Sequence, residues 1–404
     1  MKKTALLIVA AFMLLPGVCR AAESGNFEMV LFVTRQDSSM DWWDKVPPRF
    51  GAHVSQVDSV PKGAEFLILP AFRHFGLADD GTVDITYDLT VLAPDGEVDE
   101  SAADLTGRKG RTEPGGMLRA EAVAGVSFDP EDAYGEYTIR VTAYDHVTGQ
   151  QVEETRPIEL RPFSLPEVDL ADDEWFFFYP DNPRPAAALA RLLEFDGILW
   201  REERPIWSLV WFCKIIFEKN RYLLPHMMEA FEGTTPMQKK SIILLLSVME
   251  APPELPDLSP ALREFRDEVQ AIATPNPDGT PRSGDQLDLL WGGFFATGRV
   301  KPLRRIIQAF EYFEYAGERE EPRAGDQDKQ SGEGQEKVYL QAVFRTAVWS
   351  VRSNCINSPL VFHYCHYLHR HGELSEKERY ALGHVLNQAV KDMEKQDEAD
   401  NPGE

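Results

Sequence analysis

The sequence predicts a multidomain protein of mixed class, a β-sandwich followed by a short, solenoid-like α-helical array. Three observations lead to this prediction. In residues 26–162 apolar and polar residues alternate, as strands with one buried face require. In residues 183–404 capping residues repeatedly stand just before prolines, which is the pattern of helix starts. Residues 163–182 combine prolines, acids and aromatics, so we interpret them as the linker between the two domains.

The N-terminus has the layout of a secretory signal peptide. Residues 1–21 begin with lysines, continue with an apolar stretch and end in small residues. That stretch is too short to span a bilayer, and no later segment reaches about 18 uninterrupted apolar residues, so we expect no transmembrane segment. Lipid attachment at Cys19 is an alternative, but Val18 stands where that modification requires a small residue. We therefore expect an exported protein, with the periplasm as the favoured compartment.

The clearest strand signal lies in residues 82–98. Its alternating apolar residues predict one buried face and one wet face, and they are Val83, Ile85, Tyr87, Leu89 and Val91. The dipeptide Asp95-Gly96 that follows is typical of a hairpin turn. Further strands of this kind follow up to residue 162, which favours a sandwich of short strands.

One strand carries a more specific signal. Residues 135–139, GEYTI, resemble the start of strand F in immunoglobulin-like domains, where a tyrosine hydroxyl ties back to the upstream backbone. Tyr137 is that tyrosine here. Ile139 stands where antibody domains carry a cysteine, so the disulfide of those domains is absent. The resemblance implies an immunoglobulin-like β-sandwich over residues 26–162 and no particular function.

Five consecutive aromatic residues stand near the end of the linker, from Trp175 to Tyr179. Contiguous large apolar residues are usually buried, so we expect this run to wedge into the interface between the domains. A carbohydrate-stacking platform is the alternative. In both interpretations Trp175, Phe177 and Tyr179 are the candidate contact residues.

Helix starts are marked in the C-terminal half by a capping side chain before a proline. The four such dipeptides are Asn182-Pro183, Thr235-Pro236, Ser259-Pro260 and Ser358-Pro359. Thr235 and Gln238 have the spacing of a capping box, as do Ser375 and Glu378. These signals predict about ten helices of ordinary length.

The helical half also contains two similar segments. Residues 220–231 and 299–310 share an apolar stripe of helical period, which indicates helical pairs stacked on one another. Residues 318–335 are polar and rich in Gly, Glu and Gln, so we expect a mobile loop there.

Two further segments, 287–298 (LDLLWGGFFATG) and 346–354 (TAVWSVRSN), resemble signatures of functionally uncharacterised bacterial helical-repeat domains. The resemblance implies an α-helical array and no known activity or site residue. Gly298 and Asn354 end these segments, and both residue types suit the left-handed backbone at a helix C-terminus.

Three cysteines follow the signal peptide: Cys213, Cys355 and Cys365. An odd, widely spaced set is not a disulfide framework. One bridge is open to the chain, for example Cys355–Cys365. Cys365 lies about two turns beyond a helix start that follows Cys355, however, which predicts roughly 10 Å between them along the axis. Buried free thiols are therefore the expected state.

Residues 362–371, FHYCHYLHRH, concentrate four histidines and a cysteine. At about 100° per residue the predicted helix gathers its apolar residues on one side. That core-facing stripe consists of Leu360, Val361, Tyr364, Cys365 and Leu368. His363, His366 and His369 fall on the opposite side with Arg370. Neighbouring pairs of these histidines have the spacing to chelate a divalent metal, but Arg370 opposes a cation. A solvated helix face is the favoured interpretation, with adventitious metal binding as the alternative.

Signatures of catalysis and cofactor binding are absent from the sequence. It contains no Gly-x-Ser-x-Gly, no His-Glu-x-x-His, no phosphate-binding loop with its lysine and no dinucleotide fingerprint. Residues 106–116, TGRKGRTEPGG, have the glycines and bases of a phosphate-binding loop but not their order, so a strand-connecting loop is favoured. The formal net charge of -24 argues against nucleic acid and anionic membranes as partners.

These observations lead to the hypothesis of an exported, non-enzymatic binding protein of the cell envelope. Its sandwich and helical array would offer surfaces to another envelope or secreted protein, and no cofactor is expected. A glycan- or peptidoglycan-acting enzyme or binding protein is the alternative. Metal binding through His363, His366 and His369 is a weaker one, and the oligomeric state stays open.

Overall fold

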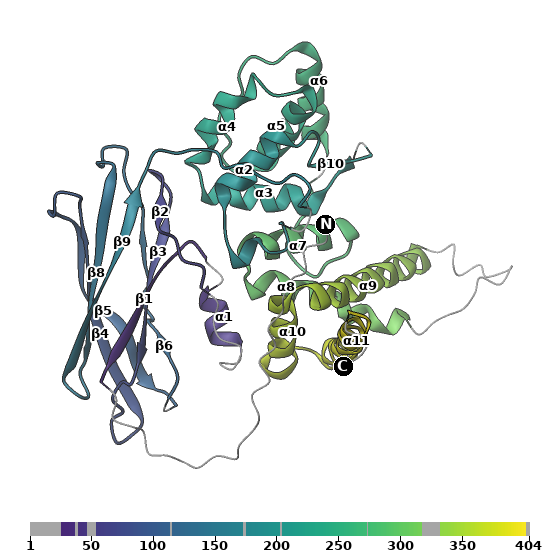
Figure 1. Cartoon of the computed structure of the whole chain (residues 1–404). Coiled ribbons are helices and arrows are strands. Elements are labelled where there is room, and N and C mark those ends of the chain that lie inside the picture. Colours follow the sequence, from purple (N-terminus) through teal and green to yellow (C-terminus); the bar gives the residue numbers. More distant parts are fainter. Residues whose placement is uncertain are drawn as a thin grey trace.

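A β-rich N-terminal domain and a helical C-terminal domain make up the structure, as the mixed class predicted (Figure 1). The computed structural model describes residues 26–36, 39–46, 54–113, 115–172, 175–202, 204–272, 274–316 and 332–400. The expected signal peptide 1–21, with Cys19, lies outside these residues. The same holds for most of the expected loop 318–335, of which residues 332–335 form the first turn of a helix.

Two sheets form the N-terminal domain. The smaller has the order β1-β3-β6, with β7 also paired to β3; its strands are β1 (Glu28–Thr34), β3 (Phe66–Arg73), β6 (Leu118–Arg119) and β7 (Ala124–Val126). The larger has the order β2-β9-β8-β4-β5; its strands are β2 (Ser59–Val60), β4 (Thr82–Leu92), β5 (Val98–Arg111), β8 (Gly135–Asp145) and β9 (Gln150–Leu160). Paired strands run antiparallel, except that β2 and β9 are parallel.

The two sheets share one core. The alternation predicted for β4 is confirmed, because Val83, Ile85, Tyr87, Leu89 and Val91 are all buried. The side chains of Ile85, Tyr87, Leu89 and Val91 pack with those of the smaller sheet in a single apolar cluster, to which β8 and β9 also contribute. Burial of this face contributes most of the free energy that holds the two sheets together.

Tyr137 occupies the position that the sequence predicted. Its ring is buried, with its centroid 4.4 Å from that of Phe128. Its hydroxyl donates a hydrogen bond of 3.1 Å to the carbonyl oxygen of Ala133, four residues upstream. The expected tie to the upstream backbone is therefore confirmed.

Helices dominate the C-terminal domain. They are α2 (Pro185–Glu194), α3 (Trp207–Lys219), α4 (Leu223–Phe231), α5 (Pro236–Val248), α6 (Pro260–Ala271), α7 (Gly284–Thr297), α8 (Val300–Gln308), α9 (Gly332–Asn357), α10 (Pro359–His371) and α11 (Glu376–Asp400). Shorter elements are η2 (Tyr179–Asp181), η3 (Ala309–Ala316), β10 (Trp200–Arg201) and β11 (Arg204–Pro205). In Figure 1, α2 to α6 form one tier and α7 to α11 a second, and α1 (Ser39–Lys45) lies between the sandwich and α10. No helix in the described ranges combines the length and the apolar character that crossing a membrane requires.

Most of the predicted helix starts are confirmed. Thr235 and Gln238 form a capping box at α5. Ser375 and Glu378 bond each other's backbone N–H groups in the same way before α11. Side chains of Ser259 and Ser358 accept from the third residue of α6 and α10.

Two predicted helix ends are wrong. Asn182-Pro183 starts no helix, because α2 begins at Pro185 and the Asn182 amide is hydrogen-bonded to Ser55 Oγ in the sandwich. Asn354 does not end a helix, because α9 continues to Asn357 and the Asn354 amide donates back to the Ser350 carbonyl oxygen. Gly298, by contrast, ends α7 with a left-handed φ of 60°, as expected.

The three cysteines of the described ranges have the expected state, because Cys213, Cys355 and Cys365 are buried free thiols. Cys355 lies in the last turn of α9 and Cys365 in the next helix, α10, which starts at Pro359.

Candidate functional site

Helix α1 contacts both domains, and we call it the brace. Two of its residues, Asp41 and Trp42, face the helical domain. The Asp41 carboxylate accepts a hydrogen bond of 3.0 Å from the backbone N–H of Val300, at the start of α8. A carboxylate is favourable there because the N-terminus of a helix carries partial positive charge. Trp42 meets His363 of α10 edge to face, with ring centroids 6.2 Å apart.

The next two residues of α1 face the sandwich. Trp43 meets Phe32 of β1 edge to face, with ring centroids 6.1 Å apart, and its Nε1 donates to the Met117 carbonyl oxygen at 3.2 Å. Asp44 accepts two hydrogen bonds from Arg119, from Nε at 3.1 Å and from Nη2 at 2.5 Å. Because each residue turns the helix by about 100°, four successive side chains can divide between two domains.

A groove with a volume of about 610 Å³ lies between α1 and the sandwich. Three aromatic side chains and three arginines contribute to its lining. The lining residues are Phe32, Trp42, Trp43, Asp44, Val46, Arg73, Arg108, Thr112, Glu113, Gly115, Gly116, Met117, Leu118 and Arg119. They come from β1, α1, β3, the end of β5 and the segment up to β6, and they include the second half of the stretch 106–116.

The arginines give this groove a cationic wall in a chain whose formal net charge is -24. Arg119 is neutralised by Asp44, and Arg108 lies 3.4 Å from a carboxylate oxygen of Glu121. Arg73 differs from both, because within the described ranges its guanidinium has no hydrogen bond and no ion pair. It is exposed at the end of β3 and is therefore the cation with the most donors to offer a ligand.

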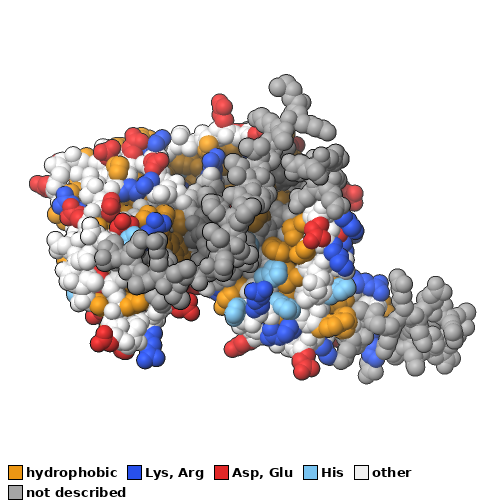
Figure 2. Space-filling view, turned by 60° about the horizontal axis from the view of Figure 1, so that its bottom comes forward, with side chains coloured by type: hydrophobic (Ala, Val, Ile, Leu, Met, Phe, Trp, Pro, Cys, Tyr) orange, Lys and Arg blue, Asp and Glu red, His pale blue; other side chains and the backbone are white. Residues whose placement is uncertain are grey.

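The predicted histidine face lies next to this brace. Figure 2 shows histidine side chains beside lysine and arginine side chains on the near face of the helical domain. The stripe predicted for the core side of α10 is confirmed as buried. The histidines opposite it are only half exposed: His363 contacts Trp42, the His366 ring centroid lies 4.6 Å from that of Phe362, and His369 lies over Gly383.

The three histidines are not brought together as a ligand set. Among the described residues no group of three or more His, Cys, Asp and Glu side chains is arranged to hold a metal ion. Positions six residues apart diverge around a helix by about 120°, so His363 and His369 do not share one face. Burial, together with Arg379 and Arg370, lowers the pKa of His369 and so disfavours its cationic form.

The aromatic run of the linker packs onto the helical domain. Trp175 lies 5.3 Å from Phe212 of α3 by ring centroids, and the Arg191 guanidinium sits over its face at 4.9 Å. Tyr179 is buried 5.0 Å from the same Phe212. Phe177 is 37% exposed and meets α7.

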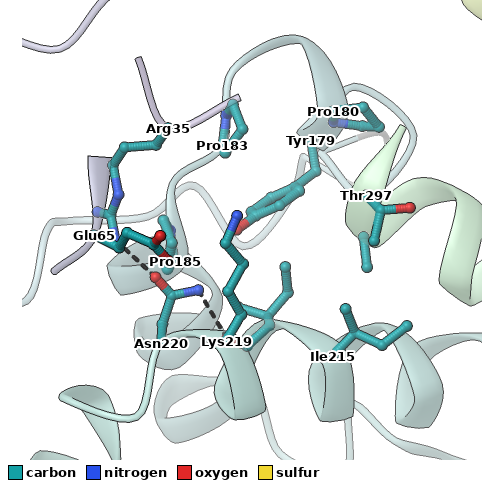
Figure 3. Close-up of a pocket in the computed structure, with 12 residues that line it drawn as sticks. Arg35, Glu65, Tyr179, Pro180, Pro183, Pro185, Ile215, Lys219, Asn220 and Thr297 are labelled. Atoms are coloured by element: carbon teal, nitrogen blue, oxygen red, sulfur yellow. Dashed lines mark hydrogen bonds between the residues drawn. The ribbon is translucent and has the colours of Figure 1, made fainter. Parts of the chain in front are cut away.

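Tyr179 also reaches a crevice at the junction of the domains. Figure 3 shows Tyr179 and Lys219 extending alongside each other in this crevice, whose lining also includes Arg35. Arg35 of the sandwich donates to Asn220 Oδ1 at 2.7 Å and to the Tyr222 hydroxyl at 3.1 Å. These contacts hold the domains together, so we interpret the crevice as part of the interface between the domains. The groove beside α1 is therefore the candidate site.

The comparisons with known proteins do not extend this description. No protein-family model matches the chain, and no curated protein matches it. A family 123 glycoside hydrolase from Clostridium perfringens is similar over 35% of this chain and 28% of its own, at 8% identity and a TM-score of 0.19. The structure of pT26-6p is similar over 91% of this chain and 49% of its own, at 10% identity and a TM-score of 0.17. Both scores are too low to indicate a shared fold, so neither likeness informs function.

The groove could not be predicted from the sequence. Its lining is scattered over five segments between residues 32 and 119, and only the fold brings them together. One signal was available: Trp42 and Trp43 stand between two aspartates in an otherwise polar stretch. Adjacent tryptophans on a short helix cannot share one face, which indicates contacts on two sides.

Proposed function

We propose that the protein is an exported, non-enzymatic binding protein of the cell envelope and that the groove beside α1 holds its ligand. The observation that carries this proposal is the lining of the groove, which combines the paired rings of Phe32 and Trp43 with Arg73, an arginine whose guanidinium has no partner among the described residues. Concave sites with apolar walls and a few polar groups are the usual form of ligand sites. The expected signal peptide supports export.

The lining supports a particular ligand chemistry. An arginine fork binds a carboxylate through two parallel hydrogen bonds, and it does so best where water is partly excluded. The Trp43 and Phe32 rings offer an apolar wall in the same groove. The ligand we propose is a carboxylate-bearing segment of another envelope or secreted protein, with an apolar side chain next to its carboxylate.

We also propose the finer fold of both domains. An immunoglobulin-like sandwich is supported by the parallel β2–β9 pair, the β9-β8-β4-β5 order and the Tyr137 hydrogen bond to Ala133. A short solenoid is supported by the two tiers of helices and by the buried stripes that α4 and α8 share. Both folds commonly present binding surfaces.

A charge-reversal pair tests the proposed site. Purified protein carrying Arg73→Glu should lose cross-linking to its envelope partner by at least tenfold relative to the unchanged protein. Arg140→Glu is the matched control, because Arg140 is an equally exposed arginine on β8 outside the groove, and it should retain the partner. Equal capture by both variants would overturn the groove as the site.

Glycan binding is the second candidate, and the aromatic wall of the groove favours it. Sugar rings stack on aromatic faces, and uronic or muramic acids would supply the carboxylate. Binding of the same two variants to isolated peptidoglycan and to a panel of acidic oligosaccharides separates the candidates. Retention on peptidoglycan that Arg73→Glu abolishes and Arg140→Glu preserves would favour the glycan over the protein partner.

A further inference from the structure

One face of α9 is exposed along most of the helix. The opposite face packs on η3, α10 and α11 and buries an apolar row. That row consists of Leu340, Val343, Phe344, Ala347, Val351 and Cys355. On the exposed face, Trp349 is 70% exposed and Val338 is 59% exposed. Because tryptophan is enriched at interfaces between proteins and exposed apolar patches mark contact sites, this face is a candidate contact surface.

The residues of this face form a straight line, which we call the α9 stripe. They follow one another at alternating steps of four and three residues, and they are Val338, Ala342, Arg345, Trp349, Arg352 and Ile356. The first four are exposed and the last two are half-buried. These steps keep all six within about 40° of one line on the helix, over a length of about 27 Å. Alternating steps of this kind are the contact pattern of two helices that pack along each other, so we expect the α9 stripe to contact a helix.

Charge distinguishes the same part of the chain. Asp and Glu account for 66 of the 404 residues, yet residues 337–372 contain neither. The exposed Arg345 guanidinium has no hydrogen bond and no ion pair in the part of the chain that the structure describes. Arg352 is neutralised by Asp392, which accepts a hydrogen bond of 2.7 Å from its Nε. Two copies of so acidic a chain repel each other, and this repulsion is weakest where a surface segment carries no acids.

We propose that two copies of this chain associate through the α9 stripe, with the two α9 helices antiparallel. The stripe is symmetric about residue 347, because positions 338 and 356, 342 and 352, and 345 and 349 lie at equal distances from it. A twofold antiparallel pair therefore sets Arg345 of each copy against Trp349 of the other. A guanidinium over a tryptophan ring is a favourable cation–π contact, and this contact forms twice in the pair.

The other contacts of the stripe agree with the antiparallel arrangement. It sets Val338 of one copy against Ile356 of the other, apolar against apolar. A parallel pair would instead set Arg345 against Arg345, and two unpaired guanidinium groups repel each other. The α9 stripe shares no residue with the lining of the groove, so the dimer does not depend on the ligand proposed there.

Sedimentation equilibrium of the full mature chain measures this association. We expect the mean mass to rise with protein concentration from that of one chain to that of two. Trp349→Arg sets an arginine against Arg345 of the second copy, and it should weaken association by about tenfold or more because the cation–π contacts and the buried tryptophan surface are lost. Tyr134→Ala is the control, since Tyr134 is an exposed aromatic residue of the sandwich, and it should associate as the unchanged protein does. A single-chain mass at every concentration, or equal association by Trp349→Arg and the unchanged protein, would overturn the proposal.

Exchanging the two residues tests the antiparallel pairing itself. The double variant Arg345→Trp/Trp349→Arg restores arginine against tryptophan in an antiparallel pair, and it should recover most of the association that Trp349→Arg loses. A double variant as weakly associated as Trp349→Arg would show that this pairing is wrong. In solutions dilute enough to hold single chains, Trp349→Arg should keep the midpoint of thermal unfolding, because the replaced side chain is exposed. A clearly lower midpoint would place Trp349 in the fold and not at a contact between copies.

Discussion

The Trp42 ring meets the His363 ring edge to face, with centroids 6.2 Å apart and planes 75° apart. This contact joins a helix of the sandwich side to the histidine-rich helix of the C-terminal domain. On the next residue of α1, Trp43 makes the matching contact with the sandwich and forms a wall of the groove. The shape of the groove therefore depends on how both domains hold α1.

Replacing Trp42 tests whether α1 is a brace. Trp42 is 9% exposed, so Trp42→Ala should lower the free energy of unfolding by about 3 kcal/mol through the lost apolar burial and the cavity. Denaturant unfolding followed by circular dichroism measures this change. Trp349→Ala is the control, because Trp349 is 70% exposed and should change stability by less than about 0.5 kcal/mol. Equal effects of the two substitutions would contradict the assignment.

Two adjacent glycines of α7 test the close packing of α3 and α7. A Cβ at Gly292 would overlap the carbonyl oxygen of Ser208, which is backbone and cannot move aside, whereas a Cβ at Gly293 finds its nearest atoms at 3.7 Å. Gly292→Ala should therefore destabilise the protein by about 2 kcal/mol or more. Gly293→Ala should be neutral or stabilising by up to about 1 kcal/mol, because alanine favours the helix. Thermal unfolding of both variants decides, and the reverse order would refute the packing.

Alkaline pH tests the sandwich core. Burial raises the pKa of Tyr87 to about 12, and its hydroxyl donates to the Ala122 carbonyl oxygen at 2.8 Å. Since its folded pKa lies above its unfolded value of 10.0, Tyr87 contributes stability that is fully present below pH 10 and is lost between pH 10 and 12. The loss should reach about 2–3 kcal/mol in denaturant titrations.

Two phenylalanine variants show whether Tyr87 causes that loss of stability. Tyr87→Phe should remove the share of this loss that Tyr87 causes, about 2–3 kcal/mol, and leave the share of other buried groups with raised pKa values, such as Tyr364 and Cys213. Tyr134→Phe should leave it unchanged, since Tyr134 is 54% exposed. A Tyr87→Phe protein that loses stability over this range as steeply as the unchanged protein would sink the prediction.

Glu378 tests the anchoring of α11. Its buried carboxylate accepts from Arg304 Nη1 at 2.8 Å and from the Ser375 backbone N–H at 2.8 Å. Glu378→Ala should cost about 2 kcal/mol, below the range for a fully buried pair because the Arg304 side chain is 26% exposed. Urea unfolding measures it, and Glu376→Ala, at an exposed acid of the same helix turn, should change little. A larger loss in the Glu376 variant would contradict the role of Glu378.

Local signals predicted much of the fold. The burial of β4 followed from alternation along a few residues, and the buried stripe of α10 followed from helical period. The capping boxes at Thr235 and Ser375 followed from a spacing of three residues. The helix start predicted at Asn182-Pro183 is wrong, and the Asn182 amide is instead hydrogen-bonded to Ser55, which lies 127 positions away along the chain. A capping preference is worth about 1 kcal/mol, and one distant hydrogen bond is enough to override it.

The sequence by itself determined the mixed class of the protein and the buried faces of β4 and α10, because these depend on periods of a few residues. Only the tertiary structure decided the groove and the α1 brace. Both join segments that no local period relates, such as Phe32 with Trp43 or Trp42 with His363. Their contacts depend on how whole helices and sheets pack against one another. That packing is determined by the apolar surface buried over the whole core, and not by the few residues in each contact.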